Sequence, residues 1–350
     1  MTQTVFANNP IVTRTFKVRF LTPAFLGNAD QSGQWRTPPF KHLLREWWRV
    51  AWAQANGFSN DVPTMRDTEA LLFGSAADGT GRRSRLRLRL GKWEEGSMKK
   101  QSWELLDKVK HPEVKFPVDA GLYLGYGPVT LTKGSKSPEL KKNAAIQAGD
   151  EAVLNLALPE SDAGLIDQAL FLIHEFGAVG GRSRNGWGSL LLIGGLESVP
   201  YPLRDWRECL DRDWAHAIGE DKRGALIWQT GAFDNWRELM TVLAEIKIGL
   251  RTQFAFPNIK PPHKHVESRH WLAYPVTRHA TLAWERNARL PNSLRFKVIE
   301  KSGKLRGRIF HVPCLPPPQF NSNVKAITSV WEKVHAFLDR RGELTRSDAV

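Results

Sequence analysis

Two arginines stand inside a glycine-rich segment, residues 177–190, with the sequence GAVGGRSRNGWGSL. Glycine has no Cβ atom, so a glycine-dense turn can adopt positive φ angles and present several main-chain N–H donors to a phosphate. Arg182 and Arg184 would add positive charge beside those donors. The segment therefore favours the binding of a polyanion over its structural alternative, a helix cap at Gly177 followed by a tight connection.

The same segment differs from the phosphate-binding loops of nucleotide-binding enzymes. It contains no G-x-x-x-x-G-K-[ST] sequence. It also leaves a predicted helix and enters a predicted strand, whereas a dinucleotide-binding G-x-G-x-x-G loop leads from a strand into a helix. We therefore expect neither NTPase activity nor a bound cofactor.

Three histidines, His263, His265 and His270, form the cluster with the closest similarity to metal ligands. A His-x-His pair on a strand points both rings in one direction, but no carboxylate or thiol completes an evident set of ligands. Contact with nucleic acid or solvent is therefore favoured, and we predict no metal site.

The overall charge points to the same kind of partner. The chain of 350 residues has 50 Lys and Arg against 36 Asp and Glu, a net charge of +14. This excess of positive charge indicates a polyanionic binding partner. Nucleic acid is the first candidate, and an acidic membrane surface is the second. The sequence has no apolar run of about 18 residues and no secretory signal pattern, and its two cysteines, Cys209 and Cys314, fit a reducing compartment. We expect a cytoplasmic protein that does not contact a membrane.

The N-terminal half has a regular order of predicted elements. From residue 13 to residue 194 the patterns read strand, helix, strand, insertion, strand, helix and strand. The first helix is expected at about 38–56, the insertion at about 91–149, and the second helix begins from a cap at Ser161 or Asp162. This order is the split βαββαβ pattern of a ferredoxin-like domain, which we assign to residues 1–200.

The C-terminal half, residues 201–350, has a weaker pattern. A helix is predicted at 234–252, two strands around a Ser-Gly turn at 293–313, and a closing helix that ends near Gly342. The domain junction is expected between 195 and 235. We therefore predict an α+β protein of two ferredoxin-like domains with insertions, of which the second is less complete.

Basic residues recur at spacings that gather them on one surface. Lys41, Arg45 and Arg49 occupy every fourth position of the first helix and form a basic ridge opposite its apolar stripe. Residues 84–90, SRLRLRL, alternate Arg and Leu, which is typical of a strand with one cationic face. For Arg87 and Arg89 a simple solvated strand face is an equally good interpretation.

Single-stranded nucleic acid is bound by cationic grooves together with aromatic side chains on which bases stack. The chain has 14 tryptophans, of which Trp35, Trp48 and Trp187 lie next to basic residues. These three rings could stack on bases or pack in the core, and both alternatives are kept. Tryptophans can also serve contacts with other proteins. The candidate RNA-binding residues are Arg36, Lys41, Arg45, Trp48, Arg49, Arg82, Arg83, Arg85, Gly180, Gly181, Arg182, Ser183, Arg184, Asn185 and Trp187.

The segment FGAVGGRSRNGWGSL resembles the glycine-rich loop of the RAMP superfamily, the RNA-binding subunits of CRISPR effector complexes. Two further segments, FLTPAFLGNADQSGQWRTPPFKHLLREWWRVAW and LLFGSAADGTGRRSRLRLRL, resemble the opening of the first RAMP subunit of Cmr-type, type III-B, complexes. The segment LRFKVIEKSGKLRGRIFHVPC is similar to its C-terminal part. The chain departs from that subfamily at Lys41-His42, where a Lys-Gly pair is usual, and at Trp187, where a smaller aromatic residue is usual.

The resemblance implies two ferredoxin-like units of the RAMP or RRM type and a role in antiviral defence. It implies a ribonucleoprotein subunit near the 3′ end of the guide RNA that helps to capture target RNA. The expected partners are guide RNA, target RNA and other RAMP subunits. On this interpretation the chain has no catalytic residue.

The alternative function is a metal-independent endoribonuclease, because some RAMP relatives cut RNA with a histidine as general acid or base. His42 and His174 are the candidates. His174 lies in an apolar helical run, which favours a packed histidine over a catalytic one.

Overall fold

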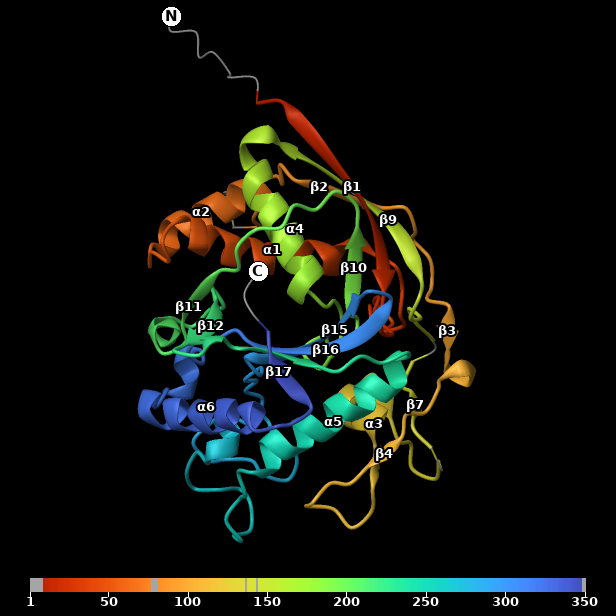
Figure 1. Ribbon diagram of the computed structural model, residues 1–350, viewed down its shortest axis with the longest axis vertical. Helices are drawn as coiled ribbons and strands as arrows, with labels where there is room; N and C mark the ends of the chain where they lie inside the picture. Colours follow the sequence, from red (N-terminus) through yellow and green to blue (C-terminus); the bar gives the residue numbers. More distant parts are fainter. Residues whose placement is uncertain (1–8, 77–80, 136, 143, 348–350) are drawn as a thin grey trace, which may run out of the picture.

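The computed structural model describes residues 9–76, 81–135, 137–142 and 144–347. Its N-terminal part is a four-stranded antiparallel sheet with the strand order β10-β1-β9-β2 (Figure 1). The strands are β1 (Ile11–Phe20), β2 (Arg87–Leu90), β9 (Glu151–Pro159) and β10 (Leu190–Ile193). Helices α1 (Thr37–Ala55) and α4 (Ala163–Phe176) connect β1 to β2 and β9 to β10. Both this chain order and this strand order are those of the predicted βαββαβ pattern.

The apolar periodicity explains these elements. Phe16, Val18 and Phe20 alternate along β1 and are buried, with Phe16 paired to Leu154 across the sheet. In α1, prolines occupy the first turn and the apolar stripe faces the core, so the predicted helix at 38–56 is confirmed. The strand predicted from residue 84 begins at Arg87, because Ser84 turns its hydroxyl to the main-chain oxygens of Leu72 and Leu86.

Helix α2 (Val62–Phe73) was not predicted from the sequence. Its periodicity is weak, since only Met65, Leu72 and Phe73 are buried apolar residues in its twelve positions. Asp61 caps it by accepting a hydrogen bond from the Thr64 N–H at 3.1 Å. This helix covers one side of α1 and supplies the carboxylate of Glu69.

The insertion consists mainly of short strands: β3 (Met98–Lys99), β4 (Lys108–Val109), β5 (Val118–Asp119), β6 (Val129–Thr130), β7 (Glu139–Leu140) and β8 (Ala144–Ala145), with a 3-10 turn at Lys100–Ser102. A short helix interrupts these strands. Residues Ala120–Gly125 form helix α3, because the Asp119 carboxylate accepts a hydrogen bond from the Leu122 N–H at 2.7 Å.

The C-terminal sheet has the strand order β15-β16-β14-β17, and all its pairs are antiparallel. Its elements are β14 (Ile227–Thr230), α5 (Trp236–Thr252), β15 (Leu294–Lys301), β16 (Lys304–His311), α6 (Val324–Asp339) and β17 (Leu344–Arg346). These elements repeat the βαββαβ order of the N-terminal half. The expectation of a less complete unit is therefore corrected: β14 and β17 are too short for their alternation to be recognised in sequence. The position of the domain boundary stays a prediction.

A small three-stranded sheet lies between the two halves, formed by β11 (Leu203–Asp205), β12 (Ile218–Asp221) and β13 (Gly224–Ala225). Four further 3-10 turns occur at Glu160–Asp162, Glu208–Asp211, Ser268–Trp271 and Pro318–Phe320. Within the described ranges, none of the helices combines the length and the apolar character needed to cross a bilayer.

The two halves share apolar and polar contacts. The ring of Phe176 on α4 lies between those of Trp47 on α1, at 5.7 Å, and Phe310 on β16, at 5.0 Å. Lys297 of β15 is fully buried and donates hydrogen bonds to the carbonyls of Ile173, at 2.8 Å, and His174 at the end of α4. The C-terminal sheet therefore caps the helix that leads into the glycine-rich segment.

Candidate nucleic-acid interface

The glycine-rich segment 177–190, here called the glycine loop, connects α4 to β10 and is held by the chain that follows β1. The Gly181 N–H donates to the carbonyl of Phe25 and the Gly188 N–H to that of Pro23, both at 2.9 Å. Gly180 has φ +96°, and a Cβ atom there would lie 2.7 Å from the Phe25 carbonyl oxygen. Gly180 and Gly181 therefore serve close packing between two segments of the protein, which corrects their prediction as ligand-facing glycines.

The tip of the glycine loop, residues 182–184, keeps the predicted main-chain donors. Within the described residues, the N–H groups of Arg182, Ser183 and Arg184 form no intramolecular hydrogen bond. Arg182 has φ +59°, an unusual angle for a residue with a side chain. Three consecutive main-chain donors without an intramolecular acceptor can form a cradle for an anion.

The two arginines of the tip point to different parts of the molecule. Arg182 donates from Nε to the carbonyl of Tyr126 in the insertion at 2.5 Å. Arg184 reaches the C-terminal half, where its Nη1 lies 3.3 Å from the carbonyl oxygen of Asn292. Burial, together with the neighbouring Arg295 charge, lowers the pKa of Arg184 to about 10. The expectation that both arginines add positive charge at one place is therefore wrong.

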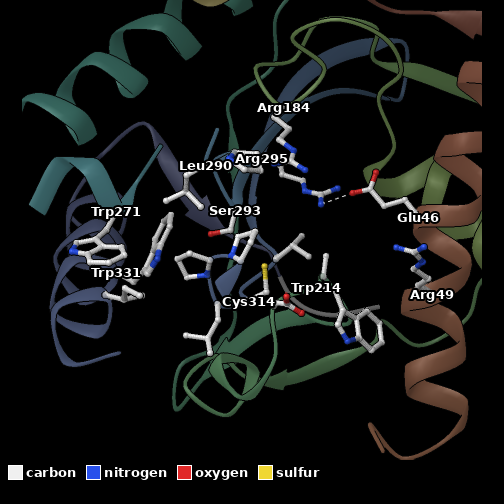
Figure 2. A pocket seen from close by; sticks show the side chains of 18 of the residues that line it. Glu46, Arg49, Arg184, Trp214, Trp271, Leu290, Ser293, Arg295, Cys314 and Trp331 are labelled. Carbon is white, nitrogen blue, oxygen red and sulfur yellow. Dashed lines mark hydrogen bonds and ion pairs between the residues drawn. The ribbon is translucent and has the colours of Figure 1, made fainter. Parts of the chain in front are cut away.

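Arg184 lines a cavity of about 440 Å³ between α1, the glycine loop and the C-terminal half (Figure 2). The cavity walls carry both cations and large rings. The lining residues are His42, Arg45, Glu46, Arg49, Arg184, Asp213, Trp214, Ala215, Trp271, Leu290, Pro291, Ser293, Arg295, Val312, Cys314, Leu315, Pro316, Pro317, Ile327 and Trp331. Three of the predicted residues, Arg45, Arg49 and Arg184, thus meet at one cavity although they lie far apart in sequence.

The basic ridge of α1 is partly neutralised by α2. The carboxylate of Glu69, only 3% exposed, accepts hydrogen bonds from both Arg45 and Arg49. The Arg49 contact is bidentate, with Nη2 at 2.8 and 2.9 Å from the two carboxylate oxygens. Two guanidinium groups therefore share one negative charge, and about one unit of positive charge is left at this end of the cavity.

A second ion pair joins α1 to the C-terminal sheet. Arg295 of β15 donates from Nη2 to Glu46 Oε1 at 2.6 Å, and Figure 2 shows this contact at the cavity wall. Burial alone would raise the pKa of Glu46, but the charges of Arg295 and Arg184 outweigh it, so the pKa is lowered. Glu46 is therefore ionised, and its charge attracts both Arg295 and Arg184. Arg184 has no carboxylate within hydrogen-bonding distance in the described residues.

The other predicted cations lie along one end of α1 and the start of β2. Lys41 donates to the Ser84 hydroxyl at 3.1 Å, and burial, with the Arg45 charge, lowers its pKa. Arg82 and Arg83 are exposed, while Arg85 lies 3.4 Å from Asp162. Arg36 is turned back to the carbonyl of Gly27 at 2.7 Å. Lys41 and Ser84 link this group to the ridge, but none of these residues lines the cavity.

All three tryptophans considered for base stacking lie in the core instead. Trp48 is 1% exposed and packs edge-on against Phe73 at 5.8 Å, and Trp187 is fully buried beside Phe25 and Trp103. Trp35 is also buried. Arg36 and Arg49 directly follow Trp35 and Trp48, and Trp187 lies three positions after Arg184, yet all three rings are buried, so sequence proximity to a cation did not predict their exposure. Asn185 is likewise used internally, because its amide donates to the Leu124 carbonyl at 2.7 Å.

Sequence reasoning missed the C-terminal part of this interface. Arg295 stands in a strand of alternating apolar residues, and an arginine among such residues was the available signal. Trp214 is half-buried at the cavity, but no local sequence pattern predicted this position. No such pattern predicted the role of the Glu69 carboxylate either. Of the histidines, His42 is exposed at the cavity, whereas His174 is packed with Nδ1 3.0 Å from the Leu192 carbonyl oxygen.

Two of the three histidines of the predicted cluster, His263 and His270, lie in the interior, whereas His265 is exposed. His263 is 2% exposed and His270 is 0% exposed. The Nε2 atom of His263 lies 2.9 Å from Nδ1 of His279. Contact of these two rings with RNA or solvent is therefore ruled out in this conformation. Within the described residues, no group of three or more His, Cys, Asp or Glu side chains is placed to hold a metal ion.

Comparisons with known proteins cover most of the chain. The apo crystal structure of Cmr1 from Pyrococcus furiosus shares 16% sequence identity with a TM-score of 0.47, over 95% of this chain and 98% of that chain. The cryo-EM structure of the type III-B Cmr-beta complex bound to cognate target RNA gives 12% identity and a TM-score of 0.45, over 93% and 99%. A search of curated proteins found no match. The RAMP superfamily model matches residues 17–191, half of the chain including α1 and the glycine loop, so the chain belongs to the RAMP superfamily.

Proposed function

We propose that this chain is a non-catalytic RNA-binding subunit of a cytoplasmic type III-B CRISPR effector complex. It would hold guide RNA near its 3′ end and help to capture target RNA, with other RAMP subunits as protein partners. Membership of the RAMP superfamily supports an RNA-binding role. The resemblance of the segments around α1 and β2 to first RAMP subunits of Cmr-type complexes supports the choice of complex.

The observation that carries this proposal is the convergence of arginines on the cavity. α1, the glycine loop and β15 each contribute guanidinium groups, and Arg184 has no carboxylate within hydrogen-bonding distance in the described residues. A largely buried cation that shares its nearest carboxylate, Glu46, with another arginine is costly, and a bound phosphate would supply further negative charge. The free N–H groups at the loop tip supply further donors for phosphate oxygens.

The cavity also has an aromatic wall. Trp214 lines it and is half-buried, so one part of its ring is open to a ligand. Bases stack on such rings without strong sequence preference, while arginines bind the backbone. The combination fits single-stranded RNA better than a purely cationic surface does.

The first prediction concerns the charge balance of the cavity. Arg184→Gln should weaken binding to unrelated single-stranded RNAs and reduce the log-log salt slope by about 0.7 if one phosphate contact is lost. Glu69→Gln should act in the opposite direction, because it releases Arg45 and Arg49 from their shared carboxylate. Fluorescence anisotropy at several salt concentrations measures both effects.

A matched control is available on α6. Lys333 is exposed and does not line the cavity, so Lys333→Gln removes one positive charge elsewhere. A salt slope in Arg184→Gln equal to that of this control, or no RNA binding by the unmodified protein, would contradict the proposed function. Circular dichroism spectra of all variants show that the fold is retained.

The endoribonuclease alternative depends on His42, which is exposed at the same cavity. Within the described residues its ring forms no hydrogen bond that would orient it as a general acid or base. We propose that the chain does not cleave RNA. Specific cleavage of labelled RNA in EDTA that disappears in His42→Ala would establish the enzyme instead.

A further inference from the structure

A second group of cations lies away from the cavity, on the insertion side of the glycine loop. We call it the α5 cluster and define it as Arg182 of the loop tip, Lys247 and Arg251 of α5, and Arg269. Helix α5 packs against α3 of the insertion, and Figure 1 shows the two side by side. The α5 cluster therefore joins the glycine loop, the insertion and the C-terminal half.

Lys247 is the most deeply buried member, with 6% exposure. Its ammonium group donates to the side-chain oxygen of Asn185 in the glycine loop and lies 5.5 Å from the centre of the Phe296 ring. Burial lowers the pKa of Lys247 strongly, and the charges of Arg251 and Arg182 lower it further. The charged groups that affect the pKa of Lys247 are thus two arginines. A group of neighbouring cations is electrostatically unfavourable unless an anion binds beside it.

Arg251 stands one helical turn after Lys247 and is also poorly satisfied. Within the described residues, its buried Nε has no hydrogen-bond partner. The hydroxyl of Tyr123 on α3 is a buried donor without a partner too, and Arg251 lies close enough to affect its pKa, which burial raises. Native proteins satisfy nearly all buried polar groups, so unsatisfied donors beside excess positive charge indicate a missing acceptor.

Acidic residues do not balance the α5 cluster. Glu113 binds Arg269 at 2.5 Å and is therefore already engaged. Arg182 has only the main-chain carbonyl of Tyr126 as an acceptor among the described residues. Three of the four cations are left without a carboxylate in hydrogen-bonding distance in the described chain.

We propose that the α5 cluster binds a phosphate group of the RNA backbone, as a site distinct from the cavity. The inference rests on the proposed function and adds a contact from the C-terminal half. A phosphate carries several acceptor oxygens and matches guanidinium donors in a forked geometry. The loop tip connects Arg182 of the α5 cluster to Arg184 at the cavity and carries the free N–H groups of residues 182–184, so an RNA strand crossing the tip would reach both sites.

The test compares stability and RNA binding in the full chain. Arg251→Met keeps the aliphatic packing but removes one charge from a repulsive group. In the absence of RNA, this variant should therefore have a Tm equal to or higher than that of the unmodified protein. Its binding to a single-stranded oligo-uridylate should weaken, with a salt slope smaller by about 0.7. A structural arginine would show the opposite combination of a lower Tm and unchanged binding.

Two further variants complete the design. Arg251→Lys keeps the charge and should retain most of the salt slope, while Lys333→Met removes a charge at an exposed position of α6, which lies outside the α5 cluster. A lower Tm in Arg251→Met, or a salt slope equal to that of Lys333→Met, would overturn the inference. If Arg184→Gln still flattens the slope, only the α5 cluster is refuted; if the unmodified protein binds no RNA, the proposed function fails as well.

Discussion

At the scale of single residues, the histidines of the C-terminal half serve packing. His335 is 5% exposed, and its Nε2 lies 3.0 Å from Nδ1 of the buried His311. Trp206 packs edge-on against the His335 ring at 5.0 Å. Burial lowers the pKa of His335 to about 3, and the nearby Asp221 carboxylate, which acts in the opposite direction, is too weak to reverse this. The neutral ring is therefore the form that fits the fold.

This gives a prediction for pH dependence. The folded pKa of His335 is below the unfolded value of 6.5, so its contribution to stability is fully present above pH 6.5 and is lost as pH falls toward 3. The free energy of unfolding should fall by about 1.4 kcal/mol per pH unit from this residue. His335→Gln, which cannot titrate, should show a shallower decrease between about pH 7 and about pH 5 in urea unfolding experiments. Equal slopes in the two proteins would disprove this role.

At the scale of elements, the glycine loop is shaped by packing before any ligand binds. Gly188 has φ +66°, and a Cβ atom there would lie 2.0 Å from the carbonyl oxygen of Val179. The Thr22 hydroxyl donates to the Gly186 carbonyl at 2.7 Å, which fixes the same turn. The loop tip is therefore presented by a rigid base, and its three free donors are held in place.

Gly188→Ala should consequently destabilise the protein by about 1–3 kcal/mol through backbone strain and the steric clash. Gly195→Ala is the matched control, because Gly195 is exposed, has no positive φ and has open space around it. Guanidinium chloride unfolding measures the difference, and hydrogen exchange of residues 177–190 should accelerate only in Gly188→Ala. Equal stability of the two variants would show that the base of the loop is adaptable.

At the scale of the whole molecule, the two halves share one core cluster. Phe310 of β16 is fully buried, with its ring 6.3 Å from that of Trp47 and 5.0 Å from that of Phe176 in the N-terminal half. Arg308 of the same strand donates to the Glu175 carboxylate at 2.5 Å. Buried contacts of this kind couple the two sheets, so the cavity between them depends on both.

Phe310→Ala should therefore lower the free energy of unfolding by about 3–5 kcal/mol and affect the whole chain. Far-UV circular dichroism and tryptophan fluorescence should still report one common transition. Phe116, which is 70% exposed, provides the control, since Phe116→Ala should change stability by less than about 0.5 kcal/mol. Two separate transitions in the unmodified protein would contradict a shared core.

The sequence by itself determined the features that depend on neighbouring residues. The periodicity of residues 13–194 predicted the N-terminal βαββαβ order, and Pro38 and Pro39 marked the start of α1. The sequence of the glycine loop resembles that of the RAMP superfamily, and the model of this family matches residues 17–191. Strand alternation, helix caps and turn residues act within a few positions, so their signals survive in a single sequence.

Only the tertiary structure decided which side chains are available to a ligand. Trp48 and Trp187 are buried although arginines lie within three positions of them, and Arg182 and Arg184 diverge although they are two positions apart. Arg45 is neutralised by a carboxylate from α2, a helix whose weak periodicity hid it. Burial and ion pairing depend on contacts between distant segments, and no local pattern records them.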